Sequence, residues 1–167
     1  MSHETLMWFH DTWLGNVTRE SNWLFTAGLT LHFVGICLVI GSMMVVDLRL
    51  IGVVRGVAIG HTFKLLPFAL VGFLINAATA TMFFCFDPVA YWENPAFKIK
   101  LVLLTLAGLN ALAFTVYEHR KLAHTAADYR TTWLTKVLGS LSLLLWFSVI
   151  LFGRLIVAFQ GSPDLFA

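Results

Sequence analysis

Four long apolar stretches constrain this chain more than any other feature of its sequence. They cover about 22–46, 62–86, 97–117 and 133–159 of the 167 residues. A helix needs about 20 mostly apolar residues to cross the hydrocarbon core of a bilayer. With 59% hydrophobic and 12% charged residues, the composition lies outside the range of soluble domains. The sequence therefore predicts four membrane-spanning helices and leaves no room for a soluble catalytic domain.

Each predicted span carries one stripe of small or weakly polar residues at helical spacing. The stripes are Gly28, His32, Gly35, Val39 and Ser42; Gly72, Asn76 and Thr79; Thr105, Gly108, Leu112 and Thr115; and Gly139, Ser142, Trp146, Val149 and Gly153. Helices in lipid pack through such faces, and short loops make consecutive helices neighbours. We therefore predict an all-α, compact, antiparallel four-helix bundle in the membrane, with Asn76 and Asn110 forming interhelical hydrogen bonds.

The segment before the first span is predicted to form one amphipathic helix at the membrane interface. Leu6, Phe9, Trp13 and Val17 recur at spacings of three and four residues, which places them on one helical face. A positive leading region is missing, so the segment does not resemble a cleaved signal peptide. The predicted organisation is an interfacial helix at 1–21, a transmembrane domain at 22–159 and a tail at 160–167.

Charge asymmetry predicts the orientation of the spans. The loops after spans 1 and 3, with the residues beside them, carry seven basic residues: Arg49, Arg55, Lys64, Arg120, Lys121, Arg130 and Lys136. Basic loops stay in the cytoplasm, so both termini are expected on the periplasmic side of a bacterial inner membrane. The formal net charge of +2 follows from this topology and does not indicate nucleic-acid binding.

His32 is the main candidate for function because it lies in the middle of the first span. A titratable side chain at that depth costs about 2 kcal/mol or more and usually faces a bundle interior, a cofactor or a cavity. Gly28 and Gly35 flank it one turn away on each side, which allows a flat macrocycle or another backbone to approach. Arg154 lies within about 6 Å of the same depth.

Two interpretations of this pair remain open at the sequence level. In one, His32 ligates a haem iron or another metal, or contacts a quinone, and Arg154 pairs with a propionate or another anionic group. In the other, His32 is structural, and Arg154 extends to the interface or pairs with an acid such as Asp87. No second histidine lies at this depth, so a haem here is five-coordinate, shares a ligand from a second protomer, or is absent.

Other residues offer weaker alternatives. His61 lies at the start of the second span and His119 at the end of the third, both on the cytoplasmic side. There they could ligate a surface haem or a transition metal. Cys37 with the adjacent methionines 43 and 44 could attract copper(I). The outer loop at 86–95 holds Tyr91, Trp92 and Glu93, a candidate docking surface for a periplasmic redox protein.

Three runs of sequence carry a family resemblance: LHFVGICLVIGSMMVVDLRLIG, FDPVAYWENPAFKIKL with LAGLNAL after it, and LLWFSVILFGRLIVAF. They resemble a bacterial family of small four-helix inner-membrane proteins, which is distantly similar to the copper-resistance D domain and the small membrane-type protoporphyrinogen oxidase. The resemblance implies no established activity. The residues that it implies as important are His32, Gly35, Asp47, Arg49, Asn110, Gly153 and Arg154.

Three functional hypotheses follow. The first is a haem- or quinone-interacting subunit for electron transfer or membrane anchoring, which is not an enzyme as an isolated chain. The second is a non-catalytic accessory or assembly subunit, which packs against other membrane subunits or a homodimer partner through its glycine stripes. The third is copper handling, which depends on family analogy and on scattered Met, Cys and His residues.

Overall fold

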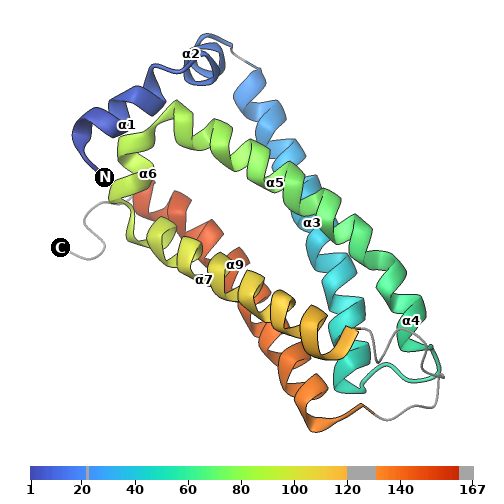
Figure 1. Ribbon diagram of the computed structural model, residues 1–167. Coiled ribbons are helices and arrows are strands. Elements are labelled where there is room, and N and C mark those ends of the chain that lie inside the picture. The colour runs from blue at the N-terminus through green and yellow to red at the C-terminus, as the bar shows by residue number, and fades with distance from the viewer. Residues whose placement is uncertain (22, 120–130, 162–167) are drawn as a thin grey trace.

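The computed structural model describes residues 1–21, 23–119 and 131–161, and within these ranges it contains helices and no strand. The predicted all-α class is confirmed. Figure 1 shows the four longest helices, which are α3 (Leu24–Ile51), α5 (Leu66–Phe86), α7 (Pro95–Phe114) and α9 (Trp133–Gly161). Short helices extend two of them: α4 (Ile59–Thr62) and η1 (Phe63–Leu65) precede α5, and the π-helix η2 (Thr115–His119) follows α7.

The four candidate spans are Leu24–Ile51, Ile59–Phe86, Pro95–Tyr117 and Trp133–Phe159, each long and apolar enough to cross a membrane. Large apolar side chains also remain exposed along their outward faces, as expected for surfaces that contact lipid. Examples from each helix are Leu29, Phe33, Phe68, Leu74, Leu109, Leu112, Leu144 and Phe147. By length, composition and surface, the chain is a multi-pass membrane protein.

The long helices form two hairpins. α3 packs along α5, α7 packs along α9, and the hairpins meet where α3 contacts α9. That contact lies toward the α4 end of the molecule, where Gly139 of α9 packs on Asp47 and Leu50 of α3 (Figure 1). α5 and α7 are joined by α6 (Pro88–Glu93) and scarcely contact each other along their lengths. The predicted packing of each span on the next therefore holds within the hairpins and is wrong between α5 and α7. The packing stripe predicted for the third span is also wrong, because its residues face outward and are exposed: Thr105, Gly108, Leu112 and Thr115.

At the α3–α5 crossing the two helix backbones approach each other closely. A Cβ atom built on Gly72 of α5 would lie 2.7 Å from the carbonyl oxygen of Gly35 and 2.9 Å from the backbone nitrogen of Val39. A Cβ on Gly35 would lie 2.9 Å from the carbonyl oxygen of Gly72. Only residues without a side chain allow two helix backbones to approach this closely.

Beyond the predicted end of the first span, α3 continues to Ile51 and ends at Gly52, whose φ of 93° is in the left-handed region that glycine adopts freely. The extra turn brings two charged residues, Asp47 and Arg49, inside the helix, and each is only 2% exposed. Nearby, Val46, Leu50, Ile59, Phe63 and Phe114 form a buried apolar cluster. This end of the molecule is therefore its best-packed part.

Of the two asparagines predicted to join helices, one does so. The Asn110 side-chain amide donates to the carbonyl oxygen of Leu138 in α9 at 3.2 Å, which confirms that prediction. Asn76 packs against Gly35, and its Oδ1 atom accepts no hydrogen bond from any residue that the structure describes.

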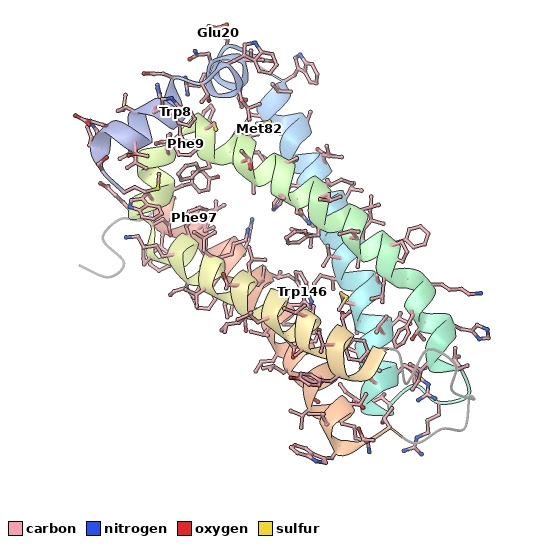
Figure 2. The ribbon with its side chains drawn as sticks, viewed as in Figure 1. Trp8, Phe9, Glu20, Met82, Phe97 and Trp146 are labelled. Carbon is pink, nitrogen blue, oxygen red and sulfur yellow. The ribbon has the colours of Figure 1, made fainter. Side chains whose placement is uncertain are left out.

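The N-terminal segment is two helices, where the sequence predicted one. α1 (His3–His10) and α2 (Trp13–Glu20) are separated at Asp11 and Thr12, and the Thr12 hydroxyl accepts from the backbone N–H of Gly15 to cap α2. The break divides the predicted apolar face: Leu6 is buried, whereas Trp13 is 77% exposed. Figure 2 shows Phe9 beside the end of α5, where its ring meets that of Phe84 at 5.3 Å.

Arg19 joins this segment to α5. Its guanidinium donates to the carbonyl oxygens of Cys85 at 3.1 Å and Phe86 at 3.2 Å, and to that of His10 at 2.6 Å. The last carbonyls of a helix have no partner within the helix and carry partial negative charge, so a cation stabilises them. α2 is therefore attached to the C-terminal end of α5.

Candidate functional site

His32 lies on the face of α3 that packs against α5, about one turn from the Gly35–Gly72 crossing. Its Nδ1 atom is 2.7 Å from the hydroxyl oxygen of Thr79 in α5, and its ring meets that of Phe83 at 5.6 Å. The side chain is half-buried. Two residues of the opposite helix therefore set the orientation of the imidazole.

The Thr79 hydroxyl has three possible acceptors for its single hydrogen. The carbonyl oxygens of Ile75 and Asn76 lie 2.8 Å and 3.2 Å away, and Nδ1 of His32 is the third. When the hydroxyl donates to a carbonyl oxygen, it accepts from Nδ1, and Nε2 of the neutral ring then carries the lone pair. The Nε2 atom forms no hydrogen bond with another described residue. Histidines that bind metals are oriented in this way through their other ring nitrogen.

The glycines on either side of His32 face α5. Met82 fills the space where a side chain on Gly28 would lie, and Figure 2 shows Met82 on α5 near the start of α3. The space beside Gly35 is occupied by Asn76 and Gly72. The backbone of α5 thus lies against Gly35 and the Met82 side chain against Gly28, so a ligand of His32 would have to approach from the side of Nε2.

Lys100 of α7 is a half-buried cation that was not singled out from the sequence. Its Nζ atom lies 3.5 Å from the position that a Cβ on Gly153 of α9 would occupy. The helical spacing within FKIKL could have indicated that Lys98 and Lys100 point to different sides, but not which of the two side chains is the more buried.

Arg154, the cation expected beside His32, is exposed on α9. Within the described ranges its side chain forms no hydrogen bond and no ion pair, with His32 or with the acids considered as its partners. The cation that packs against α9 here is Lys100, beside Gly153.

The remaining candidates do not converge on one place. His61 is exposed on α4, the side chain of His119 lies outside the described residues, and Cys37 is exposed on α3. In the part of the chain that is described, no three His, Cys, Asp or Glu side chains group as metal ligands do. In α6, Tyr91 and Trp92 are half-buried and Glu93 is exposed. Burial, with a smaller contribution from the charge of Asp87, raises the pKa of Tyr91 above its ordinary value.

A second buried polar position lies at the opposite end of α3. The Asp47 carboxylate hydrogen-bonds with Ser142 of α9, while its Oδ2 atom has no partner among the described residues. Arg49 donates from Nε to the carbonyl oxygen of Val57 at 2.6 Å. Both residues were expected to be important from the family resemblance. Their contacts join α3 to α9 and to the α3–α4 connection.

Comparison of the chain with protein-family models, with curated proteins and with solved structures found no match. The class to which the protein belongs is therefore inferred from its own fold and from the residues around His32. It is an all-α multi-pass membrane protein in which a histidine with an open Nε2 atom and a half-buried lysine come from different helix hairpins.

Proposed function

We propose that this protein is a haem-interacting redox subunit of the bacterial inner membrane and that His32 ligates the haem iron. The observation that carries the proposal is the hydrogen bond between Nδ1 of His32 and the Thr79 hydroxyl. With its proton on Nδ1, the neutral imidazole has an unused lone pair on Nε2 inside an apolar helix pair, and this is the form of histidine that binds iron.

The described residues fit a haem with one protein ligand. His32 would bind the iron, and the Thr79 hydroxyl would orient its ring. A bound haem supplies reversible one-electron transfer. A second axial ligand would come from water or from a second protomer, because the described part of the chain places no other histidine beside His32.

A quinol is the second candidate, and the same hydrogen bond favours it over a quinone. With its proton on Nδ1, the ring can accept at Nε2 but cannot donate there. It would therefore bind a hydroxyl of the reduced headgroup and not a carbonyl of the oxidised one.

The orientation and partners belong to the same proposal. The excess of basic residues around the α3–α4 connection and after α7 supports a cytoplasmic position for that end, which puts both termini in the periplasm. Tyr91, Trp92 and Glu93 of α6 would then face a periplasmic redox partner.

An accessory role without a cofactor is supported by the Gly35–Gly72 crossing, which needs no ligand to explain it. No arrangement of the described residues adds support to copper handling.

Absorption spectra of the detergent-purified protein test the haem proposal. Oxidised and dithionite-reduced samples are expected to show a Soret band, with an alpha band after reduction. His32→Ala should abolish both bands, and His61→Ala, which alters an exposed histidine at the far end, should leave them unchanged. A colourless wild-type protein that also fails to take up added haem would refute the proposal. Loss of colour in the His61 variant alone would move the site to the cytoplasmic end.

A further inference from the structure

Two buried oxygen atoms away from His32 have no hydrogen-bond partner among the described residues. They are Oδ2 of Asp47 in α3 and Oδ1 of Asn110 in α7. Their residues are only 2% and 8% exposed, so neither side chain can reach solvent for a partner. An unpaired buried acceptor is costly, and more so when it carries a charge. The packing of the described chain therefore does not account for these two atoms.

Both side chains reach the same turn of α9, the helix that packs against both α3 and α7. The Asn110 amide donates to the carbonyl oxygen of Leu138 at 3.2 Å. One turn further along α9, the hydroxyl of Ser142, itself only 6% exposed, donates to the Asp47 carboxylate. In an α-helix the carbonyl of residue 138 lies beside the N–H of residue 142, so the two contacts are neighbours. Between them, a Cβ on Gly139 would lie 3.3 Å from the carbonyl oxygen of Asp47. Side-chain oxygens from three helices thus gather around one turn.

The described residues supply no positive charge to Asp47. Its carboxylate forms no ion pair with a described lysine, arginine or histidine. Arg49 lies two residues further along α3, a spacing that places side chains on different sides of a helix, and its Nε atom donates to the carbonyl oxygen of Val57 at 2.6 Å. The basic side chains described on the neighbouring elements are exposed: His61, Lys64 and Lys136. An ionised Asp47 therefore needs a cation from elsewhere.

The chemistry of the three oxygens indicates which cation fits. Carboxylate, amide and hydroxyl oxygens are ligands of hard cations, and Na⁺ is bound by protein oxygens inside other membrane proteins. The set carries one negative charge, which neutralises a monovalent ion, whereas a divalent ion would keep an uncompensated charge in an apolar environment. A proton also neutralises the carboxylate, but it joins at most two oxygens, and three are gathered here.

We infer that Asp47, Asn110 and Ser142 form a binding site for a monovalent cation with the oxygen-ligand chemistry of Na⁺. Asp47 supplies the charge, and the amide and hydroxyl oxygens complete the set from α7 and α9. The site lies at the other end of α3 from His32, so it goes beyond the proposed haem function and does not depend on it.

Binding of radioactive sodium to the full-length, detergent-purified protein tests the inference. The assay runs at constant ionic strength with choline as the replacement ion, and at about pH 9, so that protons compete little for a buried carboxyl group. Wild-type protein is expected to bind about one ion per chain in a saturable manner, with displacement by unlabelled Na⁺ and not by choline. The bound ion should also raise the unfolding temperature as sodium replaces choline, because it binds only the folded state.

Two variants locate the ion, and each has a matched control. Asp47→Asn keeps the size of the side chain and removes its charge, so the affinity for sodium should fall about 10-fold or more. Glu20→Gln, which neutralises an exposed carboxylate, should leave the affinity unchanged. Ser142→Ala removes one ligand oxygen and should also weaken binding. Ser148→Ala is its control on the same helix, because that hydroxyl donates to the carbonyl oxygen of Leu144.

Three results would overturn the inference. The first is the absence of saturable sodium binding by the wild-type protein, which needs no variant and would leave a proton as the occupant of Asp47. The second is wild-type affinity in an Asp47→Asn protein that elutes as a folded species. The third is equal weakening by Ser142→Ala and Ser148→Ala, because the effect would then not depend on the oxygen beside Asp47. Failure of the haem proposal changes none of these measurements.

Discussion

Substitution of Gly72 by alanine is a direct test of the close α3–α5 crossing. The added Cβ would lie 2.7 Å from the Gly35 carbonyl oxygen, whereas ordinary van der Waals contact begins at 3.4 Å, so the backbones must separate by about 0.7 Å. Overpacking of this kind costs about 1–3 kcal/mol, and the contacts are to backbone atoms that cannot rotate away. The same displacement would lengthen the 2.7 Å hydrogen bond between His32 and Thr79 toward its geometric limit.

A thiol-reactive fluorophore measures the effect, because Cys85 is buried and becomes reactive when α5 separates from its neighbours. In a Cys37→Ala background, Gly72→Ala should lower the temperature of half-maximal labelling by several degrees. The matched control is Gly108→Ala in α7, where an added Cβ meets no atom within 4 Å. The control should be neutral or slightly stabilising, since alanine is the better helix former. Equal stability of the two variants would refute the account of the crossing.

Three further substitutions test the contacts around the site. Thr79→Val removes the acceptor that orients His32 and should weaken haem binding about 10- to 100-fold, whereas Thr81→Val, on an exposed face of the same helix, should have no effect on the titration. Arg19→Ala should expose Cys85 to labelling at lower temperature, because the last carbonyls of α5 lose a charged donor; unaltered labelling would argue against the attachment of α2. Asn94→Ala should destabilise the fold by about 1–2 kcal/mol in denaturant titrations, since Asn94 caps α7 and also donates to Ile156 of α9. Asn94→Asp, which keeps the cap alone, should recover only part of that loss.

The positions of the spans followed from composition, but their ends did not. The apolar pattern of the first span stops at Asp47, so the sequence predicts an end near residue 46, whereas α3 continues to Ile51. A charge ends a hydrophobic pattern without ending a helix when another element buries it. Here Ser142 of α9 bonds to Asp47, and the carbonyl of Val57 accepts from Arg49. Ser142 is distant from Asp47 in the sequence, and Val57 lies beyond the turn that ends α3. No local sequence pattern therefore reveals either contact.

For the same reason, the sequence predicted only part of the candidate site around His32. The depth and inward face of His32 follow from helical spacing, and the structure places it on the face that packs against α5. Depth alone also suggested Arg154 as its cation, but depth does not specify rotation about the helix axis. Arg154 turns outward, and the half-buried cation is Lys100 of α7. The sequence equally could not show that α6 would keep α5 and α7 apart.

The hydrogen bonds of Arg19 have a consequence for how the chain is made. Their acceptors, Cys85 and Phe86, follow Arg19 by 66 and 67 residues, so the ribosome must complete two spans before the first twenty residues can take their final place. α1 and α2 therefore dock after the α3–α5 hairpin has been inserted. The N-terminal segment is synthesised before the α3–α5 hairpin but docks after it. Docking of this segment therefore indicates that the hairpin has formed.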